Sequence, residues 1–223
     1  MNSAMPVWKQ PRGSFGSNYW TFYSFKLGRD VNFYSNLERD HGVLIEADSR
    51  IRWYCEQPLQ IRIKVDGHDR ETILDMLVRY EDGRDEYREV KYMSELAQRE
   101  KCTRIMRQLT AQQRWAQVAT THYRIVTEQE IRQNRFFLTN WKRMIAHLAA
   151  TAEESLETLE KQVMKAFEAT AVWRLVELEQ YCRPASPQLS RTAIYRLIHR
   201  GQLRAPLEES PLSKIIPIQR ARP

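Results

Sequence analysis

Two acidic residues and a lysine lie in this sequence at a spacing that could hold a metal ion beside a phosphate. Asp75 interrupts the apolar run ILDMLV, and the segment YREVKY places Glu89 two residues before Lys91. Side chains two apart on a strand share one face, so Glu89 and Lys91 are expected to point the same way. Two carboxylates suit a hard divalent cation such as Mg²⁺. A lysine beside them can orient water or stabilise the charge that develops on a phosphate.

A simpler explanation of the Glu-x-Lys triplet stays open, since such triplets also form the polar side of an amphipathic strand. Two features favour the chemical interpretation. A charge at Asp75 is costly to bury in an apolar strand unless it has a partner, and a further acid, Glu38, lies upstream in SNLERD. Acids gathered on a basic protein would repel nucleic acid unless a cation lay between them.

A hairpin must position the two acids near the triplet. Its predicted strands are residues 72–80 and 87–92, joined by a tight turn at Asp82–Gly83. This pairing would set Asp75 beside Glu89 on adjacent strands.

Helices are predicted on both sides of this hairpin. Ser35 is the predicted N-cap of the helix that carries the upstream acid. One long helix is predicted over residues 94–118, followed by a short strand over 122–126. Thr127 and Thr151 are each followed by Glu three residues later, which predicts a capping box at both positions.

The last part of the chain predicts a winged-helix arrangement. Helices are expected over residues 171–181 and 189–199, with the Pro-rich turn RPASPQ between them and Gly201 ending the second. Short strands at 203–204 and 214–218 could pair as a β-ribbon.

The composition predicts a folded, basic protein. Of 223 residues, 42% are hydrophobic, and there are only 7 Gly and 9 Pro, which excludes collagen-like, low-complexity and mostly disordered chains. Lys plus Arg number 35 against 28 Asp plus Glu, a net charge of +7. This balance suits a polyanion, although a basic protein without such a partner stays open.

Several classes of protein do not fit the sequence. No apolar run is long enough for a membrane span, and the start MNSAMPVWKQPR lacks the apolar core of a secretory signal. The 3 cysteines form no CxxC and the 5 histidines form no HExxH, so neither a zinc site nor a disulfide framework is predicted. A reducing cytoplasm is the expected setting.

Basic residues follow the candidate site and recur near the end of the chain. Arg104 and Arg107, one helical turn apart, could follow a DNA backbone, although a solvated helix face explains them equally well. The candidate DNA contacts are Arg99, Lys101, Arg104, Arg107, Arg191, Arg196 and Arg200.

In order and spacing these motifs resemble the TnsA endonuclease family, the nuclease subunit of heteromeric cut-and-paste transposases. The resemblance runs through RGSFGS, SNLERD, CEQPLQ, ILDMLVRYEDG, YREVKY and RIVTEQEIRQNRFFLTN, and more loosely through AIYRLIHRGQLRAPLEESPLSKIIPI. It covers nearly the whole chain. Two departures are Leu74, where the PD-(D/E)xK superfamily name has Pro, and Glu71–Thr72–Ile73, where a Tyr or Thr often precedes the central strand.

The order of the predicted elements indicates an α/β or α+β domain up to about residue 126 and a helical domain after it. The resemblance implies that the first domain, residues 1–126 of an α/β fold, is a type II restriction-endonuclease-like catalytic core with a PD-(D/E)xK site. Residues 127–223 would form a helical, winged-helix-like C-terminal domain for partner and DNA contact. Gln57 also matches the family, either to position water or DNA or, as we favour, to begin a strand.

The resemblance also implies a role for each site residue. Glu38 would be the helix acid at the metal, Asp75 the central ligand, Glu89 the second strand carboxylate and Lys91 the catalytic lysine. The carbonyl of Val90 would be a further metal ligand. The implied cofactor is Mg²⁺, with Mn²⁺ as a substitute.

The implied activity is Mg²⁺-dependent hydrolysis of the 5′, non-transferred strand at transposon ends, in a bacterial cytoplasm at the nucleoid. The implied partners are transposon-end DNA, a DDE-family transposase that cuts and joins the 3′ strand, and an AAA+ ATPase regulator. Docking of that regulator ranks above DNA reading for the C-terminal domain. Two alternatives stay open: a non-catalytic assembly adaptor that links transposase, regulator and DNA, and an independent restriction or repair nuclease.

Overall fold

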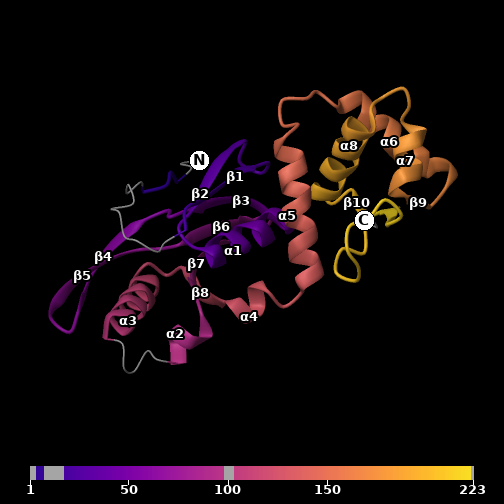
Figure 1. Ribbon diagram of the computed structural model, residues 1–223. Coiled ribbons are helices and arrows are strands. Elements are labelled where there is room, and N and C mark those ends of the chain that lie inside the picture. Colours follow the sequence, from indigo (N-terminus) through magenta and orange to yellow (C-terminus); the bar gives the residue numbers. More distant parts are fainter. Residues whose placement is uncertain (1–3, 8–17, 98–102, 222–223) are drawn as a thin grey trace. The chain divides into compact units, whose positions relative to one another are not determined.

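The computed structural model describes residues 4–7, 18–97 and 103–221, and they form two compact units (Figure 1). The first unit runs to Gln133 apart from Phe22–Phe25, which group with Asn134 and the residues after it in the second unit. No helix in the described ranges is both long and apolar enough to cross a bilayer.

A four-stranded mixed sheet is the centre of the first unit. Its strands lie in the order β3 (Ile51–Glu56), β6 (Met76–Tyr80), β7 (Asp85–Lys91) and β8 (His122–Thr127). The pairs β3–β6 and β6–β7 are antiparallel, whereas β7 and β8 are parallel, with Glu89 opposite Ile125. The predicted antiparallel pairing of the two hairpin strands, β6 and β7, is therefore present, and it ends at Arg88, one residue before Glu89.

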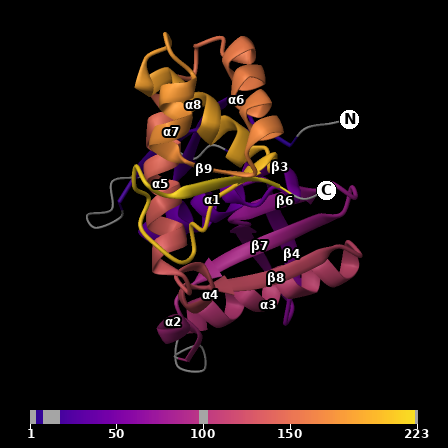
Figure 2. The ribbon, with the colours of Figure 1, turned by 90° about the vertical axis from the view of Figure 1, so that its right-hand side faces the viewer.

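Two helices cover opposite faces of this sheet. Successive side chains of β7 point to opposite faces, so alternate residues of this strand contact different helices. Val90 packs with Leu37 of α1 (Asn36–Ala47) in a buried apolar cluster. Tyr87, on the other face, makes an edge contact with Trp115 of α3 (Thr103–Val118), with ring centroids 4.9 Å apart. Figure 2 shows β7 and β8 side by side with α3 along them.

A separate hairpin packs against α3. It consists of β4 (Gln60–Val65) and β5 (His68–Ile73), and its turn residues Asp66 and Gly67 both have positive φ, 51° and 78°. This is the backbone that a tight two-residue hairpin turn requires.

The prediction of one strand over residues 72–80 is wrong. The chain leaves the hairpin after Ile73 and enters the main sheet at Met76. Two backbone hydrogen bonds hold the residues between these two strands: Leu74 N donates to Leu59 O at 3.1 Å, and Gln57 N donates to Asp75 O at 2.9 Å. The apolar run is continuous in sequence but serves two sheets.

Short elements complete the first unit. They are β2 (Arg29–Phe33) and the helices α2 (Met93–Ala97) and α4 (Glu128–Ile131). Strand β1 (Trp20–Ser24) pairs with β2, and of its residues only Trp20 and Thr21 group with the first unit. The capping box predicted at Thr127 is confirmed at the start of α4. The predicted domain boundary after residue 126 precedes this helix, whereas the second compact unit begins at Asn134.

The second unit is mostly helical. Its helices are α5 (Arg135–Ala149), α6 (Glu157–Ala169), α7 (Leu175–Tyr181) and α8 (Pro187–His199). A small antiparallel sheet has the order β10 (Leu203–Arg204), β11 (Pro217–Arg220) and β9 (Val172–Arg174). Gly201 follows the C-cap residue Arg200 of α8 and has φ 70°, as its predicted role at the helix end requires.

Two local predictions in this unit are wrong. Helix α7 begins at Leu175 because β9 takes the residues before it. Thr151 begins no helix, since α6 starts only at Glu157. The Thr151 hydroxyl instead donates to the carbonyl oxygens of His147 and Leu148, both at 3.2 Å.

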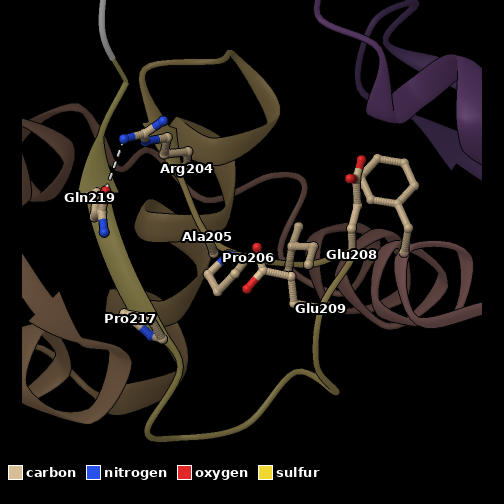
Figure 3. Close-up of a pocket in the computed structure, with 9 residues that line it drawn as sticks. Arg204, Ala205, Pro206, Glu208, Glu209, Pro217 and Gln219 are labelled. Atoms are coloured by element: carbon tan, nitrogen blue, oxygen red, sulfur yellow. Dashed lines mark hydrogen bonds between the residues drawn. The ribbon is translucent and has the colours of Figure 1, made fainter. Parts of the chain in front are cut away.

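A cavity of about 460 Å³ opens beside β10 and β11 in this unit (Figure 3). Arg204 and Gln219, which both line the cavity, lie opposite each other on β10 and β11, and Arg204 donates to Gln219 Oε1 at 3.0 Å. Glu208 and Glu209, in the loop after β10, also line the cavity, so its walls carry charges of both signs.

Candidate active site

Asp75 lies beside the part of strand β7 that extends beyond the end of the neighbouring strand β6. Strand β6 begins at Met76, opposite Arg88, so β7 continues to Lys91 without a strand partner on that side. The carboxylate of Asp75 takes the place of the missing strand, because its Oδ2 accepts from Val90 N at 2.7 Å. The gap in the ladder therefore fixes the orientation of Asp75.

The same gap exposes the carbonyl of Val90 to Asp75. In a strand the N–H and C=O of one residue point to the same side, and the N–H of Val90 points at Asp75. The Val90 carbonyl therefore lies on the side where the acid is, as a metal ligand would need to.

Glu89 and Lys91 share the face of β7 that α3 covers. Lys91 Nζ lies 2.8 Å from Glu89 Oε1, with side-chain exposures of 14% and 0%. The predicted common direction of the two side chains is thus present, and Glu89 is withdrawn from solvent beside its cation.

Two glutamines that the sequence analysis missed hold the Glu89 carboxylate. Gln108 Nε2 donates to Glu89 Oε1 at 2.7 Å, and Gln112 Nε2 donates to Oε2 at 2.8 Å. They lie four residues apart on α3 and so share one face of the helix. No sequence signal separates them from Gln113 and the other polar residues of that helix.

Glu38 lies in the first turn of α1. Its Oε2 accepts from Tyr34 N at 3.1 Å, and its own N–H donates to Ser35 Oγ at 3.0 Å, which confirms the predicted cap. Part of this pattern is that of a capping box, so Glu38 also helps to begin the helix. Its charge interacts with those of Asp75 and Lys91, which brings it to the same site.

The acids perturb one another in a site where Glu89 is fully buried and Glu38 and Asp75 are half-buried. Burial and then the charge of Asp75 raise the pKa of Glu38 to about 7 and the pKa of Glu89 to about 8. Burial also raises the pKa of Asp75, although Lys91, the Val90 N–H and a hydrogen bond with Glu89 oppose it. Burial lowers the pKa of Lys91, but the charges of Glu89 and Asp75 outweigh it and raise the pKa overall.

The comparison with protein families matches residues 48–128 to the family described as TnsA-like endonuclease N terminal. These residues form a domain similar to the N terminus of TnsA-like endonucleases, the TnsA-like domain. The match includes Asp75, Glu89 and Lys91 and ends before α5, while Glu38 precedes it. The expected similarity to the TnsA endonuclease family is confirmed over these residues, and the mixed α/β architecture with its sheet core is consistent with such a nuclease domain. No curated protein matches the chain.

The donor set of the TnsA-like domain fits a hard divalent cation. Asp75 and Glu89 influence each other's pKa, so each carboxylate is more stable when a cation offsets the charge of the other. Mg²⁺ needs only one or two carboxylates, because it keeps several of its waters. As they stand, no three His, Cys, Asp or Glu side chains in the described part of the chain form a cluster that could hold a metal, so Glu38 would have to approach or act through water.

The predicted DNA contacts differ in their surroundings. Arg104 and Arg107 of the TnsA-like domain are exposed on α3. Arg99 and Lys101 lie outside the described residues.

In the second unit the three predicted arginines have partners of their own. Arg191 Nε donates to Glu179 at 2.7 Å, and Arg200 pairs with Glu160 at 2.6 Å. Arg196 donates to the carbonyl oxygens of Thr151 and Glu154 at 2.7 and 2.8 Å. Their contact with DNA stays a prediction.

Proposed function

We propose that this chain is the Mg²⁺-dependent DNA endonuclease subunit of a heteromeric, Tn7-like transposase, and that it hydrolyses the 5′, non-transferred strand at transposon ends. The observation that carries the proposal is the convergence of Asp75, Glu89 and Lys91 at the open end of β7, in a domain of the TnsA-like endonuclease family.

Asp75, Glu89 and the Val90 carbonyl are the proposed ligands of Mg²⁺, which when bound would offset negative charge on the phosphate. Mn²⁺ could replace it. Lys91 holds its proton at neutral pH because its pKa is raised. We therefore assign it hydrogen bonding and charge stabilisation at the phosphate. In the reaction water attacks phosphorus and gives up a proton, the bond to the departing sugar oxygen breaks, and that oxygen takes up a proton, so that one new end carries the phosphate and the other a hydroxyl.

A strand-specific cleavage assay tests this function. The full partner set, with a DDE-family transposase and an AAA+ regulator, is combined with DNA labelled on each strand in turn. Asp75→Ala and Lys91→Ala should abolish 5′ cleavage and leave 3′ joining intact. Asp85→Asn, at the other end of β7 and paired with Arg79, serves as the control. Undiminished 5′ nicking by Asp75→Ala would refute the proposal and favour the adaptor function.

The second unit is the proposed docking domain. Its two helices α7 and α8 with the sheet β10-β11-β9 support a winged-helix assignment. Arg191 and Arg196 of α8 and Arg200 directly after it are engaged with Glu179, backbone carbonyls and Glu160, which favours docking of the AAA+ regulator over reading of DNA by this helix. Co-purification of the full chain with the ATP-bound regulator, with and without transposon-end DNA, tests this ranking.

A further inference from the structure

A groove of about 620 Å³ lies between the hairpin β4–β5 and helix α3. Its walls carry Arg70 from β5 and Arg104 and Arg107 from α3, together with Thr72, Ile73 and Gln108. All of these residues belong to the first unit. The groove is therefore a feature of the first unit alone, and three arginines line it.

The arginines of the groove are not matched by acids. Within the described ranges, Arg70 Nε is buried without a hydrogen-bond partner, and neither Arg104 nor Arg107 forms an ion pair. Arg29 and Arg79 elsewhere in the same unit are paired with Glu56 and Asp85 at 2.6 and 2.7 Å. A buried N–H without an acceptor carries a desolvation cost that a bound anion would remove.

Glu71, the acid among the residues that line the groove, interacts with partners other than the three arginines. Glu71 accepts from Gln60 at 3.1 Å and lies 3.5 Å from Arg62. Its charge is thus shared with an arginine that does not line the groove. The groove keeps an excess of positive charge.

The groove leads directly to the candidate active site. Gln108 lines the groove and also donates to Glu89 Oε1 at 2.7 Å. On the opposite wall, Thr72 and Ile73 are followed after one residue by Asp75. A chain of anionic groups lying in the groove would therefore extend to the acids and Lys91.

We propose that this groove binds the sugar–phosphate backbone of the DNA strand whose scissile phosphate enters the site, with Arg70, Arg104 and Arg107 in contact with its phosphates. The identity of that strand as substrate rests on the proposed nuclease function, whereas binding itself does not. Arg104 and Arg107 lie one helical turn apart, about 5–6 Å between their Cβ atoms, on a rigid helix. Arg70 lines the groove from strand β5, so arginines of both walls would contact the phosphates of the DNA backbone.

Binding of DNA without cleavage tests the groove. The probe is a fluorescein-labelled DNA duplex in Ca²⁺, read by fluorescence anisotropy over a series of salt concentrations. The variant carries Arg70→Gln, Arg104→Gln and Arg107→Gln. The logarithm of the binding constant should fall less steeply with the logarithm of salt, by about 2 to 3 in slope, because each lost phosphate contact removes about 0.9. Its affinity at low salt should fall at least tenfold.

The matched control removes the same charge elsewhere in the first unit. Arg50→Gln, Arg52→Gln and Arg84→Gln change three exposed arginines that do not line the groove. Their combined variant should keep the wild-type slope. Thermal unfolding of both variants, followed by circular dichroism, checks that each is folded.

The possible outcomes separate the groove from the proposed function. An unchanged slope in the groove variant overturns the groove, as does an equal loss in the control, since diffuse charge would then explain binding. A second anisotropy probe, labelled polyglutamate, stands for an acidic protein partner. If the groove variant loses binding of polyglutamate while its duplex binding is unchanged, the proposal is also overturned, in favour of such a partner. If the wild type binds through the groove but never cleaves with its full partner set, the nuclease function fails and the groove stands.

Discussion

The side-chain amide of Gln112 donates to Glu89 Oε2 at 2.8 Å, and both side chains are fully buried. Gln112 is itself held, because its Oε1 accepts from the hydroxyl of Tyr123 at 2.8 Å. Its amide also lies 3.3 Å from Thr72 Oγ1. The direction of the Glu89 carboxylate is therefore set by α3, β5 and β8 together, and α3 belongs to the candidate site as much as the strand does.

Gln112→Leu should weaken both Mg²⁺ binding and 5′ cleavage. The change leaves Glu89 without one of its donors, and loss of an outer partner of a metal ligand commonly costs about 10- to 100-fold. The free energy of unfolding should fall by about 1–3 kcal/mol, the usual cost of a buried group left unsatisfied. The measurements are the Mg²⁺ midpoint of 5′ cleavage and urea unfolding. Gln117→Leu, exposed on the same helix, is the control.

A positioning role for Gln112 requires the Mg²⁺ midpoint to move. If Gln112→Leu loses stability while its midpoint and its rate at saturating Mg²⁺ match the wild type, the residue only packs the core.

Lys91→Met should abolish 5′ cleavage while DNA binding in Ca²⁺ stays within about twofold. The thioether chain fills the space but removes the ammonium that lies 2.8 Å from Glu89. Loss of a charge aimed at the reacting phosphate typically costs about 10²–10³ in rate. Single-turnover cleavage measures the rate, and anisotropy measures binding. Lys64→Met on the exposed face of the β4–β5 hairpin is the control. A Lys91→Met protein that cuts at the wild-type rate would remove the lysine from the mechanism.

The parts of the site that the sequence predicted depend on short-range physics. The shared face of Glu89 and Lys91 follows from the two-residue period of a strand, and the Ser35 cap follows from one side chain and the N–H groups next to it. The position of Asp75 beside Glu89 followed from the tight turn of the hairpin.

The parts that the sequence did not predict depend on partners far along the chain. The apolar run around Asp75 reads as one strand, and it divides only because Leu59 and Gln57 take its backbone groups. Thr151 matches a capping box, but its carbonyl is taken by Arg196 and its hydroxyl lies 3.1 Å from that of Thr192. Tertiary contacts outweigh the local preference in both places.

Acid should destabilise the first unit through His41. Its Nε2 lies 3.2 Å from Arg88 Nη1, and burial together with the Arg88 charge holds the pKa of His41 well below its usual value. Below pH 6.5 the unfolded chain gains a proton that the folded chain refuses, so stability falls as the pH falls. The slope from one such proton approaches about 1.4 kcal/mol per pH unit.

Urea unfolding at pH 7.5 and pH 5.5 measures this loss. His41→Gln keeps an acceptor for Arg88 but cannot titrate, so its stability should fall less between the two pH values than that of the wild type. His147 also has a pKa lowered by burial, so His147→Gln is the matched comparison for the second unit. Equal pH dependence in the wild type and His41→Gln would show that the buried histidine is not the source.

Mg²⁺ should bind more tightly as the pH rises from 6 to 8.5. Burial and the Asp75 charge raise the pKa of Glu38 to about 7 and that of Glu89 to about 8, so below these values the acids hold protons that a cation must displace. Titration calorimetry in two buffers of different ionisation enthalpy should therefore detect proton release at pH 7. Asp75→Asn should abolish binding, and Asp85→Asn should leave it unchanged. Binding that is independent of pH, or that survives Asp75→Asn, would place the cation away from these carboxyls.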